Sequence, residues 1–566
     1  MHRILKSHLE NFVQSFELSD LDEAKQFEHF VNYCVISPKT GENFDIADVT
    51  TGDGDSGIDG VAIVIDEEVV LSSADAVLIF SGDKKNHDVD LVFTQAKTSE
   101  GFDLGDLLKF QQGVLTFVTS DSFSSSDECE SEAHETFDTC LNSVPKIRGG
   151  KPSITARYVT TGVYQSPDAL EKAKDSFIAS LQQTGYFANI DVAILGRDEL
   201  TNLWVSTYSA VQAQLPISSN APLPPIQGIE EAYLVVAKAS DVVTQLLTAD
   251  DGTLRAQVFE ENVRSFLGTD NAVNKSIAQT LRDEHAATRF PVMNNGITIV
   301  SEDVRVQGNV IHLENYQIVN GCQTSHVLFE NKDVLTPNVM VNLKIIETTN
   351  EDVFAELVRA TNSQSKIEDT QFFSLRPIVK RAEQYFSTYQ EDDAKLYLER
   401  RDRQYVGKDV PAVRTFSVNN AAKCVAAMFL NRPELSYRYP KQMYEDLGER
   451  IFDDTNREVI FYTACLALYR AHLLISNGTI PQNMKKTKWH MLPLIRLAVA
   501  GKDMPALNSR KIETYCQPII DVLSKHQSAV SPFAKVVSAV EGLGTLTSDR
   551  LKRQAVLEEM VAGLEG

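Results

Sequence analysis

Helix-like and strand-like hydrophobic patterns alternate along the N-terminal third of the chain. Leu21, Ala24, Val31 and Val35 recur at helical spacing, which predicts an amphipathic helix over residues 21–36. Short apolar runs bounded by turn-forming residues follow it, and this alternation favours an α/β domain. The same patterns predict strands near 59–65, 69–80, 91–97, 153–161 and 190–195, and helices over 104–118 and from residue 197 onward.

The rest of the chain divides into two further regions. The proline-rich stretch Ala221–Pro225 predicts a linker. After it, a helix over 274–281 and apolar strands near 297–300 and 317–319 predict an α+β unit. From residue 418 onward, apolar stripes at helical spacing predict a mostly helical region that supports the second unit or joins copies of the chain as a homo-oligomer. We therefore expect an α/β multidomain protein with domains at 1–215, 226–415 and 416–566.

The composition is that of a soluble multidomain protein, and the net charge limits its chemistry. Of the 566 residues, 43% are hydrophobic and 23% are charged, as in ordinary globular proteins. The net charge of -24 argues against a surface coated in basic residues for nonspecific nucleic-acid binding. It does not exclude a nuclease, because a local groove and a bound Mg²⁺ can supply the positive field.

The cysteines and the apolar segments favour a cytoplasmic protein. The seven cysteines are scattered and include no C-x-x-C pair, which favours reduced thiols and argues against a structural zinc site. Residues 1–6 lack a long apolar stretch, so we expect no signal peptide. The apolar stretch near 460–475 contains Arg470 and His472 and is too short to span a bilayer, so we expect no membrane partner.

Two neighbouring apolar runs end in side chains suited to a divalent cation and to phosphate chemistry. Asp59 precedes the first run, and Gln95, Ala96 and Lys97 end the second. Because side chains alternate along a strand, Gln95 and Lys97 share a face, while the Ala96 carbonyl stays available to a metal. Asp59 would supply a carboxylate to the cation, and Lys97 would place a positive charge against the attacking water or the phosphorane.

A further carboxylate lies in the helix predicted ahead of these strands. Glu28 falls inside the apolar stripe, four residues after Ala24 and three before Val31. A carboxylate on the buried face of a helix is costly unless it is paired or bound to a metal. A lone Gly-x-Asp-Gly or Gln-x-Lys segment is usually structural, whereas these elements in this order favour a catalytic site.

The order of helix glutamate, Gly-x-Asp strand and Gln-x-Lys strand resembles the Mrr-like branch of the PD-(D/E)xK nucleases. The resemblance implies a restriction-endonuclease-like α/β domain, Mg²⁺ or Mn²⁺ as cofactor, and nucleic acid as substrate, with DNA favoured. A glutamine in place of glutamate removes one carboxylate and leaves the number of metals open. A degenerate fold that binds nucleic acid without cutting is the alternative. The resemblance implies catalytic roles for Glu28, Asp59, Gln95 and Lys97, with the metal at Glu28, Asp59 and Ala96.

The second unit carries a longer series of ordered segments. The series runs through 259–268, 290–300, 317–325 and 359–364. It resembles the AIPR family, named for abortive infection phage resistance, which implies a central α+β AIPR domain and a role in prokaryotic anti-phage defence. On that resemblance, the first unit cuts nucleic acid and the second unit senses, binds or restrains.

Polar residues within these segments are candidates for ligand or nucleic-acid binding. A strand, the turn at Gly321 and a following helix start expose N–H groups to an anion. The same residues can instead cap turns and satisfy buried backbone. Cys322 with His326 one helical turn later is the alternative of cysteine chemistry. The candidates for a polar pocket are Arg264, Asn294, Asn295, Asn320, Gln323, Arg359 and Asn362.

A basic run interleaved with tyrosines follows the second unit's motifs. Arg400 and Arg401 lie between Tyr397 and Tyr405, an arrangement that suits phosphate contact and base stacking. Acidic residues such as Glu399 lie among them, so a salt-bridged surface is the equal alternative.

Overall fold

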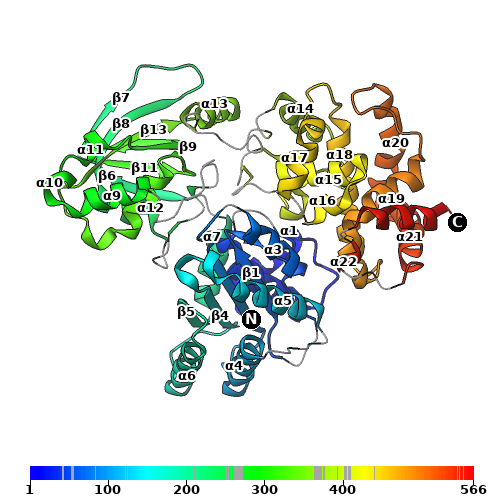
Figure 1. The fold of residues 1–566 in the computed structure, drawn as a ribbon, viewed down its shortest axis with the longest axis horizontal. Coiled ribbons are helices and arrows are strands. Elements are labelled where there is room, and N and C mark those ends of the chain that lie inside the picture. Colours follow the sequence, from blue (N-terminus) through cyan, green and yellow to red (C-terminus); the bar gives the residue numbers. More distant parts are fainter. Residues whose placement is uncertain are drawn as a thin grey trace.

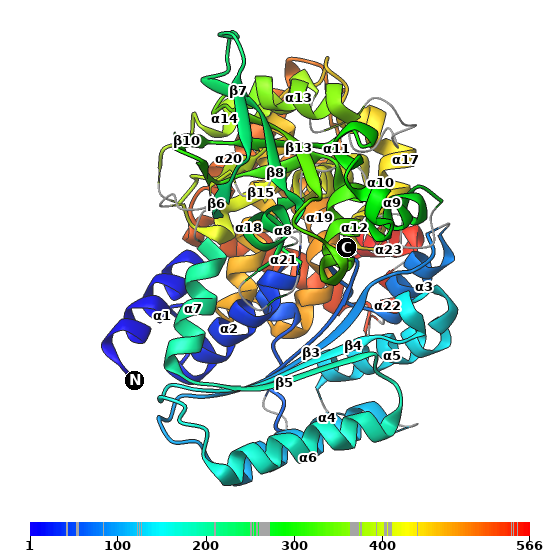
Figure 2. The ribbon, with the colours of Figure 1, turned by 90° about the vertical axis from the view of Figure 1, so that its left-hand side faces the viewer.

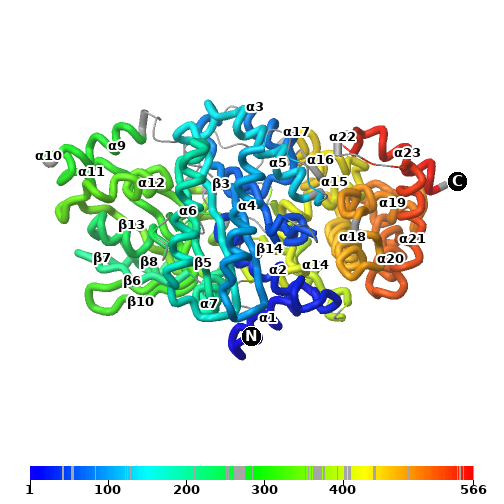
Figure 3. Tube along the Cα trace, turned by 90° about the horizontal axis from the view of Figure 1, so that it is seen from below, coloured from blue at the N-terminus to red at the C-terminus, as the bar shows by residue number. Residues whose placement is uncertain are grey.

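Buried side chains gather into three packed units in the computed structural model of the chain (Figure 1). The first unit draws its core from residues 5–204, the second from 213–358, and the third from 373–560. Figures 1 and 3 show the N-terminal unit beneath and between the other two. The structure describes the chain except residues 41–43, 53–55, 83, 121–122, 124, 126, 209–210, 250–251, 253, 256–257, 260–271, 363–372, 374–375, 392, 401–403, 406–409, 439, 545, 547, 552 and 566.

A five-stranded sheet forms the centre of the N-terminal unit, with its strands in the order β2-β1-β3-β4-β5. Strand β1 is antiparallel to β2 and β3, whereas β3, β4 and β5 run parallel. The register of β1 with β3 begins with Gly60 opposite Thr94. The bounds are β1 Gly60–Ile65, β2 Glu68–Val69, β3 Val89–Lys97, β4 Ser153–Thr160 and β5 Asn189–Leu195.

Two layers of helices cover this sheet, because successive strand residues point to opposite faces (Figure 2). Ala62 and Val64 share a core with α1, α2 and α7, whereas Val61 and Ile63 share a core with α4, α5 and α6. The helices are α1 Arg3–Ser15, α2 Glu23–Ile36, α3 Ser73–Ser81, α4 Leu104–Thr119, α5 Glu128–Asn142, α6 Asp168–Thr184 and α7 Arg197–Tyr208.

Two expectations for this unit are wrong. The run 69–80, predicted as a strand, forms helix α3, because the Ser72 hydroxyl accepts the N–H of Asp75 and caps a helix there. Ala24, placed on the buried stripe of α2, is exposed, because α2 packs through Phe27 and Phe30 instead. The other predicted helices and strands of this unit agree with the structure to within a few residues.

The central unit is built on two antiparallel-rich sheets. One sheet has the order β12-β9-β13-β8-β7, with β9 and β13 parallel, and a smaller one has the order β10-β11-β6. The strands are β6 Gln212–Pro216, β7 Ser219–Pro222, β8 Glu231–Lys238, β9 Ile297–Ser301, β10 Asp303–Gln307, β11 Val310–Glu314, β12 Gln317–Asn320 and β13 Met340–Glu347. The helices are α8 Ala239–Val242, α9 Ala272–Arg282, α10 Glu284–Ala287, α11 Phe290–Met293, α12 Cys322–Glu330 and α13 Glu351–Asn362.

The proline-rich stretch 221–225 is not the linker that the sequence predicted. Its first two residues lie in β7, which pairs with β8 through Pro222 opposite Tyr233. Proline is tolerated there because β7 is the edge strand of its sheet. The central core already includes Ala213 and Leu215 of β6, so the passage from the first unit to the second lies before residue 212.

The C-terminal unit is mostly helical, as predicted. Its core begins at Phe373 rather than near residue 416, so that α14, β14 and β15 pack with the helices that follow. Within the described part of the chain, α18 alone is long and apolar enough to cross a membrane, so the expectation that this stretch is too short is wrong. In the structure, 78% of it is buried, as in a core helix. The elements are α14 Pro377–Phe386, β14 Tyr397–Glu399, β15 Thr415–Ser417, α15 Val418–Leu430, α16 Pro433–Arg438, α17 Pro440–Ile451, α18 Val459–Ser476, α19 Lys488–Ala500, α20 Lys511–Leu523, α21 His526–Glu541, α22 Ser548–Leu551 and α23 Gln554–Glu565.

Candidate active site

The Asp59 carboxylate takes the place of a strand partner at the end of β3. The pairing of β1 with β3 begins at Gly60 opposite Thr94, and the Asp59 N–H still bonds to the Thr94 carbonyl at 2.9 Å. One residue pair further on, the Asp59 side chain accepts the Ala96 N–H through Oδ2 at 2.8 Å. Because N–H and C=O of one strand residue point to the same neighbour, the Ala96 carbonyl is also directed to the Asp59 side. The structure thus brings the Asp59 side chain beside the Ala96 backbone.

Burial and nearby lysines have opposite effects on the pKa of Asp59. Burial raises the pKa of Asp59 above its ordinary value, although the Ala96 N–H opposes that shift. Three ammonium groups from three elements also act to lower the pKa of this carboxyl: Lys97 of β3, Lys25 of α2 and Lys109 of α4. Lys109 reaches this region along the loop before Asp59, where its side chain lies beside Gly57. The pKa of Asp59 stays above its ordinary value, so burial outweighs the Ala96 N–H and the three lysines.

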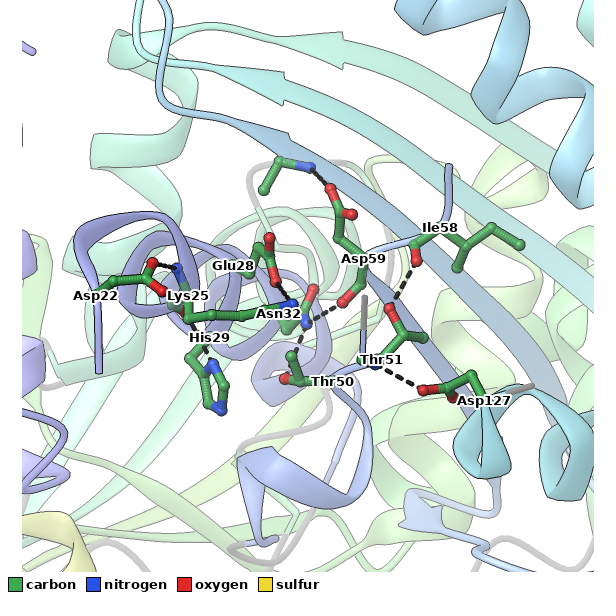
Figure 4. A network of polar contacts seen from close by, with 12 residues as sticks. Asp22, Lys25, Glu28, His29, Asn32, Thr50, Thr51, Ile58, Asp59 and Asp127 are labelled. Atoms are coloured by element: carbon green, nitrogen blue, oxygen red, sulfur yellow. Dashed lines mark hydrogen bonds and ion pairs between the residues drawn. The ribbon is translucent and has the colours of Figure 1, made fainter. Parts of the chain in front are cut away.

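Helix α2 presents a polar stripe to the same end of the sheet. Lys25, Glu28, His29 and Asn32 occupy positions i, i+3, i+4 and i+7, so they share one face of the helix. Lys25 donates to Glu28 at 2.8 Å, and the Glu28 side chain is only 15% exposed. Lys25 acts on both carboxylates, since it pairs with Glu28 and lowers the pKa of Asp59. Glu28 therefore lies on the side of α2 that faces the Asp59 end of the sheet (Figure 4).

Asn32 ties α2 to the two strands of the site, and sequence reasoning missed it. Its Nδ2 donates to the Asp59 carbonyl at 3.0 Å and to Thr50 Oγ1 at 3.0 Å (Figure 4). Its Oδ1 accepts the Thr94 hydroxyl. A Cβ at Gly60 would collide with this amide, so the glycine after Asp59 gives room for Asn32. The available signal was an asparagine one helical turn after Glu28, on the same helix face.

Gln95 and Lys97 lie at the end of β3 with different environments. Gln95 is 1% exposed, and its side-chain oxygen has no hydrogen-bond partner among the described residues. Such an orphaned acceptor is costly, which favours a donor or a cation beside it in the working protein. Lys97, two residues later on the same strand face, is half-buried at the strand end.

The donors at this site fit a hard cation. Glu28 and Asp59 offer carboxylate oxygens and Ala96 a carbonyl oxygen, the ligand types that Mg²⁺ and Mn²⁺ accept. Among the described residues, no group of three or more His, Cys, Asp or Glu side chains comes together in a form that could hold a metal. A site with glutamine in place of the second strand acid has only two carboxylates, so it would leave several positions on the cation to water.

Two polar candidates of the central unit, Asn294 and Gln323, are hydrogen-bonded to neighbouring residues. Asn294 Nδ2 donates to Thr324 Oγ1 at 3.2 Å, and Asn294 Oδ1 accepts the Gly296 N–H at 2.8 Å. Gln323 accepts from Asn274 at 2.9 Å. The local geometry thus matches the alternative in which these side chains fix turns. Asn295 is exposed and Asn320 is half-buried, while Arg264 and the side chains of Arg359 and Asn362 lie outside the described residues.

Cys322 and His326 lack the electrostatics of a nucleophile and its base. Burial raises the pKa of the Cys322 thiol to about 12, and burial lowers the pKa of His326 to about 4. At neutral pH the first is a thiol and the second a neutral imidazole, so neither charge state of an activated pair is favoured.

The basic run of the C-terminal unit is occupied by ion pairs where the structure describes it. Arg400 is 10% exposed and lies between Asp352 at 3.4 Å and Glu383 at 3.3 Å. This is the salt-bridged alternative rather than an open phosphate contact. Arg401 lies outside the described residues.

Comparison with protein families identifies the second half of the chain. Residues 259–540 match the family model described as AIPR protein. Comparisons with curated proteins and with solved structures gave no match. The matched stretch runs from the central unit through most of the helical unit, so the two are one family region rather than a domain and an appendage. The chain therefore carries an AIPR protein region over residues 259–540, preceded by the α/β unit that contains Asp59.

Proposed function

We propose that the chain is a metal-dependent endonuclease whose N-terminal unit hydrolyses phosphodiester bonds of nucleic acid, with DNA favoured. The observation that carries this proposal is the Asp59 carboxylate bonded to the Ala96 N–H at 2.8 Å, between Gln95 and Lys97 of the neighbouring strand. A structural aspartate in a turn does not require Lys97, Lys25 and Lys109 from three elements around it. An anionic substrate does require such a field.

The chain's own residues would divide the chemistry as follows. Glu28, Asp59 and the Ala96 carbonyl would hold Mg²⁺ or Mn²⁺, which when bound supplies Lewis-acid activation of water and phosphate. Lys97 would stabilise negative charge as it develops on the phosphorane. Lys109, exposed on α4 beside the loop before Asp59, would contact the phosphate backbone of the substrate.

The AIPR region supplies the context for this activity. A role in anti-phage abortive infection is what the family suggests for residues 259–540. The central unit would then sense, bind or restrain, and the N-terminal unit would cut. The thiol state of Cys322 and the neutral state of His326 favour a binding role over a second enzyme.

A cleavage assay on the purified full chain tests the proposal. Supercoiled plasmid, linear duplex, single-stranded DNA and RNA are each incubated with Mg²⁺, Mn²⁺, Ca²⁺ or EDTA. We expect nicking or cutting with Mg²⁺ or Mn²⁺ and little turnover with Ca²⁺, because an all-oxygen site with open water positions suits the octahedral ions. Undiminished cleavage in excess EDTA would refute the metal mechanism.

An inactive nucleic-acid-binding regulator is the second candidate. The observation that favours it is Gln95 in place of an acid, together with the lack of a three-carboxylate group among the described residues. A protein that binds duplex DNA in a gel-shift assay but cuts none of the substrates would be this regulator. Cleavage that appears only in Gln95→Glu would identify the glutamine as the cause.

A further inference from the structure

A cluster of opposite charges joins the N-terminal unit to the C-terminal helices. Lys488 Nζ lies 2.9 Å from Asp45 and 3.4 Å from Asp48, and Lys485 Nζ lies 3.1 Å from Asp48. His472 Nδ1 of α18 lies 3.3 Å from Asp45. These five residues are named the η2 clamp, because Asp45 caps the short 3-10 helix η2, Ile46–Asp48, and Asp48 ends it.

The η2 clamp is mostly buried, and Asp45 stays ionised within it. The side chains of Asp45 and Lys488 are 15% and 13% exposed. Burial acts to raise the pKa of Asp45, but Lys488, His472 and Lys485 outweigh it and hold that pKa well below its ordinary value. Removal of either partner of such a buried ion pair is destabilising, because the other charge is then left buried and unpaired.

Thr50 and Thr51, shortly after η2, connect it to the candidate active site. Thr50 Oγ1 donates to the Ile46 carbonyl of η2 at 2.9 Å. The same oxygen accepts from Asn32 Nδ2, which also donates to the Asp59 carbonyl, both at 3.0 Å. The backbone repeats the connection, since the Thr51 N–H bonds to the Asp59 carbonyl at 3.2 Å. A displacement of η2 is therefore transmitted to Asp59 through two short routes.

Lys486, which lies between the two clamp lysines in the sequence, contacts α5, and α5 in turn bonds to residues shortly before Asp59. Lys486 Nζ lies 3.0 Å from Glu132 of α5. At the start of α5, Asp127 accepts the Gly52 N–H at 2.6 Å, and Glu130 accepts the Ser56 hydroxyl. Gly52 and Ser56 both lie in the stretch of chain shortly before Asp59. The segment Lys485 to Lys488 thus contacts both η2 and α5, the two elements that bond to the residues leading into Asp59.

We propose that Lys488 and its partner Asp45 are positioning residues of the nuclease site, so that the docked AIPR region sets the position of Asp59. The inference rests on the proposed function, because it assigns regulation to that site. Separation of the two units by a ligand of the AIPR region would release η2 and with it Asp59. The C-terminal region then acts on cutting through this contact rather than through the substrate.

Three variants of the full chain test this proposal against simple docking. Lys488→Met removes the charge, Lys488→Arg keeps it, and Asp45→Asn with Lys488→Met removes both charges and so leaves no buried charge unpaired. The matched control is Arg414→Met, which breaks another ion pair between the same two units, at 2.6 Å from Glu17. That pair has similar burial, and its described partners, which include Tyr469 of α18, belong neither to η2 nor to the Asp59 site.

Two measurements are made on each variant: amide hydrogen exchange over residues 44–62, and the Mg²⁺ concentration for half-maximal cleavage. With Lys488→Met and with the double variant, we expect faster exchange over this segment and a metal requirement about 10- to 100-fold higher, as for lost supports of metal ligands. Lys488→Arg should keep the exchange rate and the metal requirement close to the wild-type values, and Arg414→Met should change neither quantity.

The outcomes separate failure of this inference from failure of the proposed function. If Lys488→Met and the double variant match wild type in exchange and metal requirement, the clamp only stabilises the docking of the two units, and the inference is wrong. The inference is also wrong if Arg414→Met produces the same changes as Lys488→Met. If wild type cuts nothing, the proposed function fails. Exchange over 44–62 then still decides whether Lys488 controls the position of the Asp59 segment.

Discussion

The amide of Asn32 holds the candidate active site together, so its removal is the sharpest single perturbation. Asn32 is fully buried and bonds to the Asp59 carbonyl, to Thr50 Oγ1 and to the Thr94 hydroxyl. Replacement by leucine puts an apolar side chain of similar size at this position of α2 and removes all of these bonds. We expect the N-terminal unit to lose stability and Asp59 to lose its fixed position.

The loss in the free energy of unfolding follows from what each partner retains. The Asp59 carbonyl keeps the Thr51 N–H, and Thr50 still donates to Ile46, so neither is left without a partner. The Thr94 hydroxyl is fully buried and loses its bond to Asn32. A net hydrogen bond contributes about 1 kcal/mol and a buried group left unpaired costs about 1–3 kcal/mol, so the expected loss is about 3 kcal/mol.

The two tryptophans of the chain allow the N-terminal unit to be followed by itself. Trp204 packs against Phe30 of α2 with ring centroids 5.3 Å apart, whereas Trp489 lies in the C-terminal core. In a Trp489→Phe background, fluorescence in urea reports unfolding around α2 and α7. With a denaturant slope of about 2 kcal/mol per M, the Asn32→Leu midpoint should fall by about 1.5 M.

A matched control removes an exposed asparagine from the same unit. Asn202 is exposed on α7, so Asn202→Leu should leave the midpoint within about 0.3 M of its background. An Asn32→Leu midpoint equal to that of Asn202→Leu would refute the claim that the buried amide network holds α2 to the strands.

Three further predictions concern other residues of the site and the AIPR region. Gly60→Ala should lower the free energy of unfolding by about 1–3 kcal/mol, because its Cβ collides with Asn32, whereas Gly101→Ala, with open space around it, should be near neutral in the same urea assay. Asp59→Asn should raise stability at neutral pH. Burial raises the pKa of Asp59, so its ionised form destabilises the fold above the unfolded pKa, and the gain should vanish as the pH falls below about 4 in pH-dependent urea titrations. Cys322→Ser should leave cleavage and nucleic-acid affinity nearly unchanged, since the thiol is buried and protonated, and a large loss of either would reinstate cysteine chemistry.

The site was predictable where local pattern and chemistry coincide. An acid before one apolar strand and a Gln-x-Lys at the end of the next are local signals, and the structure brings Asp59 beside Ala96. Convergence of Glu28 with Gln95 and Lys97 on one metal stays a prediction. Helix α2, which carries Glu28, covers the face of β3 with Thr94 and Ala96, whereas Gln95 and Lys97 lie on the opposite face. The helix period alone identifies a face, but the core face was decided by the larger Phe27 and Phe30.

The misses have physical causes that a single sequence does not reveal. Residues 69–80 are apolar enough for a strand, and the Ser72 cap decides for a helix. The prolines after residue 221 predicted a linker, but Pro222 lies in the edge strand β7, where proline is tolerated. Asn32 and Lys488 act through partners far away in the chain, and such pairings appear only when the elements are packed.

Single-turnover cleavage by the full chain tests the central claim most directly. Enzyme in excess over end-labelled duplex DNA is started with Mg²⁺, and the cleavage rate is compared for wild type, Lys97→Ala and Lys172→Ala. Lys172 is an exposed lysine of α6 in the same unit and serves as the control. The account predicts a loss of about 100-fold or more in Lys97→Ala, the size typical for a group that stabilises developing charge, with Lys172→Ala unchanged. Equal rates for wild type and Lys97→Ala would contradict the assignment of this site.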